Sequence, residues 1–205
     1  MTLRTANIIP DMAASPLAAW GHDAPWQITS EAEKIVRQLI TTLPKADYLV
    51  NGDIACHRSA RIDPGSVLKG AVIIGPDCFV AAHTLLRQGV WLDRGCSIGP
   101  GCEVKSSFLF AKARLAHFNF VGDSVIGANV NFEAGSIVAN TRNERAGTVH
   151  VRHKGQMVDT RAAKFGALVG AGARIGANAV LAPGTILAAG AIVERLELID
   201  QERGE

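Results

Sequence analysis

A period of six residues dominates the middle of the chain. Aliphatic residues fall on every sixth position without interruption at Ile62, Leu68, Ile74, Val80, Leu86, Leu92, Ile98 and Val104. This period fits neither an α-helix, with 3.6 residues per turn, nor a simple strand, which alternates every second residue. It is typical of hexapeptide repeats, in which three hexads form one triangular coil and successive coils stack. The sequence therefore predicts an all-β solenoid.

Small or compact residues accompany the repeat, four positions after most of the aliphatics, at Ser66, Val72, Cys78, Thr84, Val90, Cys96 and Cys102. Such residues let the chain turn a corner, and only 5% of the chain is aromatic, which suits a thin solenoid. We interpret the cysteines in this set as buried free thiols that act as small apolar side chains, rather than as disulfides or metal ligands. Free thiols favour a reducing, cytoplasmic location.

The repeat continues beyond Val104 with two shortened steps, through Leu109, Leu115, Val121, Ile126, Phe132 and Val138. It disappears between Ala139 and about Gly166, and returns at Val169, Ile175, Leu181, Leu187 and Val193. At 18 residues per coil we expect roughly six coils. An insertion in a solenoid becomes a loop on one face, so the interruption predicts a loop at about 141–165.

Three regions are predicted from these boundaries: an N-terminal arm and capping helix over 1–48, a β-helix domain over 49–195, and a C-terminal cap or tail over 196–205. Ser30 offers an N-cap and Glu33 completes a capping box, after which apolar residues follow at helical spacing until Pro44. We expect this helix to cover the open end of the solenoid.

Composition excludes several classes of protein. The net charge of +2 gives no reason to expect nucleic-acid binding. Residues 1–20 lack a continuous apolar core before Pro10, so we expect no signal peptide. The apolar stretch 166–193 contains glycines, Pro183 and Arg174 and keeps the period of six, so we expect no membrane helix.

The interrupted segment is basic. Residues 142–164 carry six Lys or Arg against two Asp or Glu. Two interpretations stay open: a solvated mobile loop, or a lobe that binds an anion.

Arg87 and Lys105 each follow a core aliphatic and are 18 residues apart. One coil separates them, so we expect them to stack about 4.8 Å apart on one face. Opposed like charges are unfavourable, and no carboxylate is obvious at the same place in the neighbouring repeats, although Asp93 or Glu103 could lean across. The pair predicts a phosphate site, the alternative being two solvated cations.

His117 lies where the repeats are least regular, in "LAHFNFVGD". A histidine can take a proton near neutral pH, so His117 is a candidate general base, although a lone histidine is more often structural. Asn131 and Asn140 fall at expected corners or strand ends, where asparagine is common.

Residues 117–140, "HFNFVGDSVIGANVNFEAGSIVAN", resemble the acyltransferase β-helix of the bifunctional enzymes that make UDP-N-acetylglucosamine. The later "KFGALVGAGARIGANAVLAPGTIL", residues 164–187, is similar to the archaeal and stand-alone forms. The resemblance covers roughly residues 60–193. It implies a left-handed parallel β-helix, which is an exception to the usual right-handed crossover. It also implies a homotrimer with its active site between subunits, and acetyl-CoA as the donor.

Site residues follow from the resemblance, position by position. His117 matches the general base, and Asn140 a residue near the reacting acyl group. Residues implied to bind the acceptor are Arg87, Lys105, Phe120, Asn131 and either Lys154 or Lys164. Residues implied to contact the cofactor are Asn140, Thr141 and Ala177. Phe120 and Thr141 replace two tyrosines of the family, which leaves the acceptor's identity open.

The sequence thus predicts a CoA-dependent N-acyltransferase that transfers an acetyl group to an amino-sugar phosphate, such as glucosamine 1-phosphate, or to a nucleotide-linked amino sugar. No metal is expected. One alternative is a non-catalytic trimer that binds a sugar nucleotide or serves as a scaffold. A second is a γ-type carbonic anhydrase on the same fold, which needs histidines five residues apart. Lys112 and Gly122 occupy those positions around His117 and disfavour it.

Overall fold

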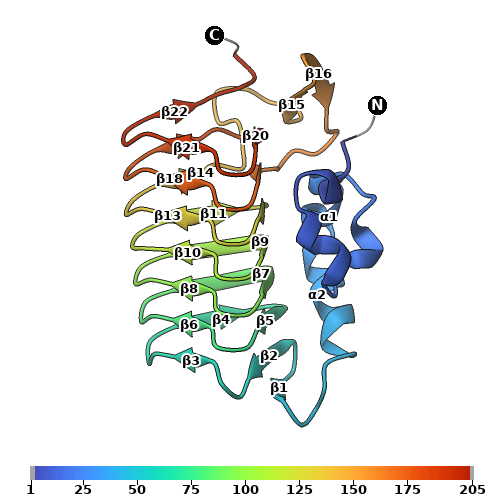
Figure 1. The fold of residues 1–205 in the computed structure, drawn as a ribbon, viewed down its shortest axis with the longest axis vertical. Coiled ribbons are helices and arrows are strands. Elements are labelled where there is room, and N and C mark those ends of the chain that lie inside the picture. The colour runs from blue at the N-terminus through green and yellow to red at the C-terminus, as the bar shows by residue number, and fades with distance from the viewer. Residues whose placement is uncertain (1–2, 204–205) are drawn as a thin grey trace.

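The computed structural model describes residues 3–203 and consists of a triangular solenoid with a helical arm along one side (Figure 1). The arm contains three 3-10 helices, η1 (Thr5–Asn7), η2 (Pro10–Ala14) and η3 (Ala18–Trp20), followed by the α-helices α1 (Pro25–Ser30) and α2 (Ala32–Ile40). Among the described residues, no helix is long and apolar enough to span a bilayer.

The first face of the solenoid is a parallel sheet of seven two-residue strands: β3 (Arg61–Ile62), β6 (Phe79–Val80), β8 (Ser97–Ile98), β10 (Arg114–Leu115), β13 (Asn131–Phe132), β18 (Arg174–Ile175) and β21 (Ile192–Val193). In each strand the first residue points outward and the second points into the solenoid. Because the chain crosses this face seven times, the expectation of about six coils was too low.

The second and third faces form one sheet of 13 strands, because β7 (Leu85–Leu92) and β9 (Glu103–Leu109) each continue around a corner. The second face contains the first halves of β7 and β9 with β4 (Val67–Lys69), β11 (Phe120–Gly122), β14 (Ile137–Val138), β19 (Val180–Leu181) and β22 (Leu198–Ile199). The third face contains their second halves with β1 (Tyr48–Asn51), β2 (Ile54–His57), β5 (Val72–Ile74), β12 (Val125–Ile126), β17 (Ala167–Val169) and β20 (Thr185–Leu187). Only β1 in this sheet pairs antiparallel, with β2.

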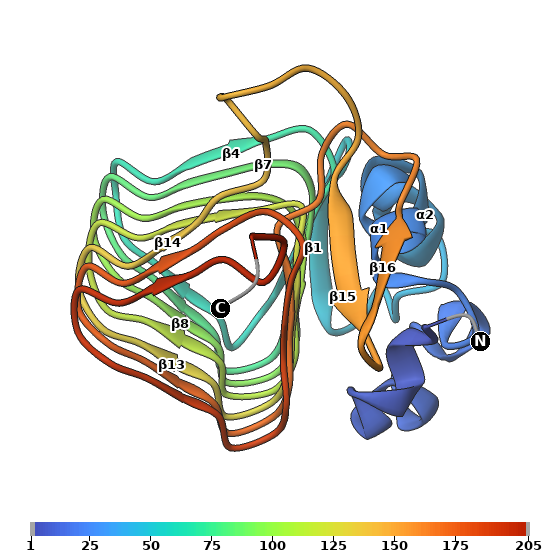
Figure 2. The ribbon, with the colours of Figure 1, turned by 90° about the horizontal axis from the view of Figure 1, so that it is seen from above.

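The solenoid is left-handed, as the resemblance implied. In Figure 1 the arrows of the front strands run to the left while the chain climbs from β3 to β21. Figure 2, seen from above, shows the same coils as stacked triangles. Successive coils therefore join parallel strands by crossovers of the rare hand.

The interior of the triangle is filled by the aliphatic repeat. Ile74, Val80, Leu86, Leu92, Ile98 and Val104 are fully buried, and so are the residues after the two shortened steps. Cys78, Cys96 and Cys102 are buried free thiols, as the repeat predicted. The predicted register of the core is thus confirmed across both breaks and the insertion.

A second apolar core lies outside the triangle, against the third face. One outward column of that face is apolar throughout and consists of Ala55, Ile73, Trp91, Phe108, Val125, Leu168 and Ile186. Ile35, Val36 and Leu39 of α2 pack on this column. Gly89 permits the close approach, since a Cβ there would lie 2.4 Å from the backbone of Ala32.

The helices therefore cover a side of the solenoid, and the expectation that they cap its open end was wrong. Their apolar stripe follows the apolar column, which runs along the stack rather than across its end. The expected N-cap at Ser30 was also wrong. Ser30 ends α1 and donates to the Gln27 carbonyl, while Gln27 Oε1 accepts from the Ala24 N–H at the start of α1.

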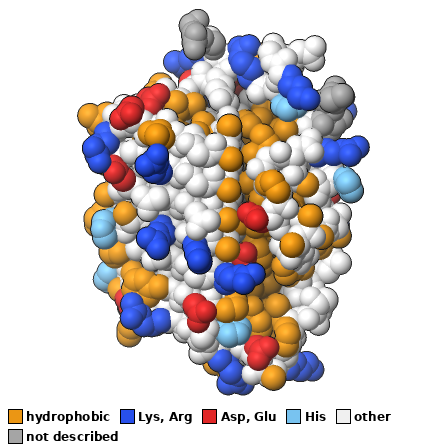
Figure 3. All heavy atoms as spheres, viewed as in Figure 1, with side chains coloured by type: hydrophobic (Ala, Val, Ile, Leu, Met, Phe, Trp, Pro, Cys, Tyr) orange, Lys and Arg blue, Asp and Glu red, His pale blue; other side chains and the backbone are white. Residues whose placement is uncertain are grey.

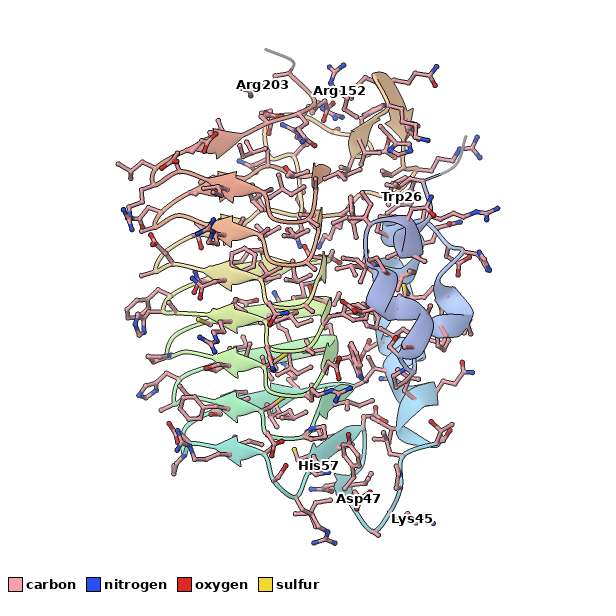
Figure 4. All side chains as sticks on the ribbon, in the orientation of Figure 1. Trp26, Lys45, Asp47, His57, Arg152 and Arg203 are labelled. Carbon is pink, nitrogen blue, oxygen red and sulfur yellow. The ribbon has the colours of Figure 1, made fainter. Side chains whose placement is uncertain are left out.

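The insertion expected at about 141–165 contains an antiparallel hairpin, β15 (His150–His153) and β16 (Gln156–Asp159). The two views together show the hairpin above α1, on the side of the third face (Figures 1 and 2). Val151 is fully buried there, and Phe165 packs edge-on against Trp26 of α1 with ring centroids 5.8 Å apart (Figure 4). The insertion is thus anchored to the fold by a few buried residues, while most of its other side chains, including those at the hairpin turn, stay exposed.

We predict that the second core is required for stability. Leu168→Ala should lower the free energy of unfolding by about 2–5 kcal/mol, because it opens a cavity under the helices. Leu49→Ala is the matched control, since Leu49 is 57% exposed, and it should change stability by less than about 0.5 kcal/mol. Urea denaturation measures both. Equal effects would mean that the arm adds little to the fold.

Candidate functional site

Arg87 and Lys105 lie directly opposite each other on β7 and β9, as their spacing predicted. Both are paired with a carboxylate. Lys105 Nζ lies 2.9 Å from both oxygens of Asp123, and Arg87 lies 2.7 Å from Glu103 Oε1. Glu103 was one of the two carboxylates expected to reach the Arg87–Lys105 pair. Asp123 was missed, although it belongs to the quoted segment, and the expectation that no neighbouring repeat supplies a carboxylate was wrong.

Asp123 connects three of the elements that carry the site. It follows β11 at a corner, with a positive φ of 47°, which turns its side chain back toward Lys105. Its carboxylate also accepts a hydrogen bond from Asn140 Nδ2. Asp123 is 5% exposed and Lys105 is 8% exposed, so water screens their attraction poorly. The carboxylate therefore fixes Lys105 and Asn140 together.

Phe120 and Asn140 meet over Gly122. A Cβ built on Gly122 would lie 2.7 Å from Asn140 Nδ2 and 2.8 Å from Phe120 Cζ. Only glycine therefore leaves space for both side chains at this position. We call Lys105, Phe120, Gly122, Asp123 and Asn140 the β11 cluster.

The amide of Asn140 has a defined orientation. Its NH₂ group must face Asp123, because a carboxylate only accepts hydrogen bonds. Its oxygen Oδ1 therefore points away, toward the Thr141 hydroxyl at 3.4 Å. Asn140 thus offers an acceptor and one remaining N–H to any ligand beside it.

His117 lies at the corner that precedes β11, and its side chain is exposed. Phe118, the next residue, has a φ of 53° and is 72% exposed, an uncommon conformation and exposure for a phenylalanine. His117 and Gly122 are at most about 17 Å apart along the strand at 3.3 Å per residue. Among residues 3–203, no side-chain hydrogen bond joins His117 to the β11 cluster. The structure places His117 on the same coil as Phe120, Gly122 and Asp123, with no hydrogen bond to them within the described part of the chain.

Asn131 and Ala177 lie near each other, on the first face and at the corner that follows it. Asn131 is exposed and lines a cavity of about 200 Å³, together with Glu133 and Arg174. The Ala177 N–H donates to Glu133 Oε2 at 2.9 Å. The backbone N–H of Ala177, near which the resemblance places a cofactor contact, is thus already hydrogen-bonded to Glu133.

The two loop lysines lie in different places. Lys164 is exposed and directly precedes Phe165, whose N–H donates to the Asn140 carbonyl at 3.0 Å. Lys154 lies at the tip of the hairpin between β15 and β16. Lys164 is therefore the loop lysine whose backbone adjoins the β11 cluster.

Two of the six basic residues of the insertion, Arg142 and Arg145, form ion pairs with the C-terminal segment. Arg142, whose side chain is 6% exposed, lies 2.7 Å from Asp200 and 3.0 Å from Glu202. Arg145 also pairs with Glu202, and Arg152 donates to the Gln201 carbonyl at the top of the molecule (Figure 4). The interpretation as an anion-binding lobe therefore does not apply to Arg142 and Arg145, and it stays a prediction for the rest of the segment.

The Arg142 guanidinium lowers the pKa of Asp200 through a bidentate hydrogen bond. Because the pKa is lower in the folded state, the pair stabilises the fold above the ordinary carboxyl pKa of about 3.9. That contribution is lost as the pH falls through the lowered value. Arg142 thus anchors the start of the insertion, two residues after Asn140.

Comparisons with known proteins give distant relatives. A bifunctional sugar-1-phosphate nucleotidylyltransferase/acetyltransferase of Sulfurisphaera tokodaii is 33% identical over 121 residues, 59% of this chain and 30% of that protein. Bifunctional protein GlmU of Methanococcus maripaludis is 28% identical over 153 residues, 73% of this chain and 36% of that protein. The chain thus spans about a third of the length of these relatives. No family model matches it.

A solved hexapeptide transferase family protein from Anaplasma phagocytophilum is 20% identical, and 71% of this chain aligns with 73% of that one. The TM-score is 0.28, so the likeness carries no weight. The sequence relatives support a distant relationship with the acetyltransferase β-helices, in agreement with the resemblance seen in residues 117–140.

We predict that the buried pair Lys105–Asp123 is far more important for stability than the pair Arg87–Glu103. Asp123→Asn should cost about 3–5 kcal/mol of unfolding free energy, because it leaves a buried ammonium without its counter-ion. The matched variant Glu103→Gln should cost at most about 1 kcal/mol, since that pair is roughly a third exposed. Urea titration of both variants tests this, and a similar loss in the two would contradict the burial argument.

Proposed function

We propose that this chain, a hexapeptide-repeat β-helix protein distantly related to GlmU-like acetyltransferases, is a CoA-dependent N-acyltransferase. Its donor would be acetyl-CoA and its acceptor an amino-sugar phosphate or a nucleotide-linked amino sugar. The observation that carries the proposal is the β11 cluster. Three residues chosen from sequence, Lys105, Phe120 and Asn140, assemble around one strand end. His117 lies at the corner that precedes the same strand.

In the proposed reaction His117 removes a proton from the acceptor's ammonium group, because an ammonium has no lone pair to attack a thioester. The free amine attacks the thioester carbonyl carbon and forms a C–N bond. The C–S bond then breaks, CoA leaves as the thiolate, and the second proton of the amine passes to it. The remaining N–H of Asn140 would stabilise the tetrahedral oxyanion, while Oδ1 would accept a hydrogen bond from the amine.

Arg87 and Lys105 would hold the acceptor's phosphate. Lys105 already donates to two oxygens of Asp123 and to Ser106 Oγ. Arg87 is more available, because its side chain is 29% exposed and guanidinium has five N–H donors in a fixed geometry. We expect Arg87 to make the first phosphate contact, while Asp123 keeps Lys105 in position. Lys164, rather than Lys154, would contact the acceptor from the insertion.

The proposal includes a homotrimer. The second face carries an outward column that is apolar except for one position, and it consists of Val67, Leu85, Glu103, Phe120, Ile137, Val180 and Leu198. Unlike the column of the third face, it is not covered by the arm, and Val67 and Leu198 are 51% and 59% exposed. Exposed contiguous apolar surface favours association with another subunit. The residues of the β11 cluster border this column, so a neighbouring subunit would complete the site.

We predict that Leu198→Lys converts the trimer to a monomer, because it places a charge in the apolar column. Light scattering at micromolar concentration measures the mass. Leu49→Lys is the matched control, since Leu49 is similarly exposed but lies on β1 outside the column. A monomeric wild-type protein would remove the inter-subunit site from the proposal.

The catalytic part is tested by thiol release from acetyl-CoA across a panel of amino-sugar phosphates and nucleotide-linked amino sugars. His117→Ala should lower kcat by about 10²–10⁴, the usual contribution of a positioned base, with CoA affinity changed by no more than a few-fold. His83→Ala is the control, because His83 is an exposed histidine at the same corner two coils earlier. No turnover by the wild type, with retained sugar-nucleotide binding, would favour the non-catalytic alternative.

A further inference from the structure

The outward column of the first face differs from the other two. It consists of Arg61, Phe79, Ser97, Arg114, Asn131, Arg174 and Ile192, each directly opposite the next. Arg61 lies over the Phe79 ring, 4.2 Å from its centroid. That cation therefore has an aromatic partner on the next coil.

Arg114 and Arg174 have no such partner. They flank Asn131 on the coils below and above it, at about 4.8 Å per coil. All three side chains are exposed. Among the described residues, neither arginine makes an ion pair, a side-chain hydrogen bond or a ring contact. By contrast, Arg87 and Lys105 already have carboxylate partners.

The acidic groups near this column do not neutralise it. None lies on β8, β10, β13 or β18. Glu133, just after β13, is held by Arg195 at 2.7 Å and 2.8 Å and by the Ala177 N–H. Glu194 lies beyond β21 next to Arg195, while Lys112 precedes β10 and adds another positive charge. Figure 3 shows Lys and Arg side chains standing on this face.

A cavity adjoins the column. It has a volume of about 200 Å³ and its polar lining residues are Asn131, Glu133, Arg174, Glu194 and Arg195. Arg114 is outside this lining and lies opposite Asn131 on the coil below. Pockets for whole drug-sized ligands are about 300–1,000 Å³, so this one suits a single group of a larger ligand. Guanidinium groups donate strong bidentate hydrogen bonds to phosphate oxygens, and the Asn131 amide N–H can donate a further, weaker one.

We propose that Arg114, Asn131 and Arg174 form a phosphate-binding site, separate from Arg87 and Lys105. The site takes a phosphate or diphosphate group of a ligand whose remainder lies outside the cavity. Two ligands of the proposed reaction carry such groups: CoA, and a nucleotide-linked acceptor. Binding to this site requires no turnover, so it can be tested even if the chain is not an enzyme.

Titration calorimetry of the full chain with inorganic pyrophosphate, at low ionic strength, tests the site directly. Arg114→Gln and Arg174→Gln should each weaken binding about tenfold, because each removes a charge-assisted contact. Arg61→Gln is the matched control from the same column and should leave the affinity within about twofold. Failure of pyrophosphate to bind, or equal weakening by all three variants, overturns the proposal.

The source of the phosphate is distinguished with four ligands and the Arg174→Gln variant. Weaker binding of CoA with unchanged binding of dephospho-CoA assigns the site to the 3′-phosphate of CoA. Equal weakening of both assigns it to the CoA diphosphate. Weaker binding of UDP-glucosamine but not of glucosamine 1-phosphate assigns it to a nucleotide-linked acceptor. Unchanged binding of all four overturns a role for this site in either ligand.

Discussion

The parallel hydrogen-bond ladder between successive coils determines where every other group of this molecule lies. Each coil donates to the next over all three faces, so a residue sits directly above its equivalent, about 4.8 Å away. Side chains therefore form columns that run along the stack. The inward columns are the core, and the outward columns give each face its own character: basic on the first, apolar and open on the second, apolar and covered on the third.

These columns are also the part of the fold that sequence reasoning could predict. A period of six fixes which residues point inward, and counting one coil from Arg87 reaches Lys105. A plain count of 18 residues from Lys105 also reaches Asp123, the residue that pairs with it. The shortened step, however, makes Gly122 rather than Asp123 the ladder partner of Lys105. Asp123 then falls at a corner, where its left-handed backbone rather than the period directs the side chain.

Contacts between segments of different kinds could not be predicted from a repeat. Arg142 and Asp200 are 58 residues apart, and no period connects them. The placement of α2 depends on which outward column is apolar. Because the second and third faces both carry an apolar column, the sequence pattern alone does not say which face α2 covers. Gly89 makes the difference on the third face, since it gives the helix backbone room that a side chain would occupy.

The insertion has a consequence for how this protein can diversify. Ile137 pairs directly with Val180, although 42 residues separate them, so the ladder closes beneath the insertion as if it were absent. The register of the coils is thus independent of the insertion, although its buried residues pack on the third face and on α1. Lengthening, shortening or exchanging the exposed residues of the insertion, such as those at the turn between β15 and β16, would therefore leave the register of every coil unchanged. The coils and the exposed part of the insertion can therefore vary separately.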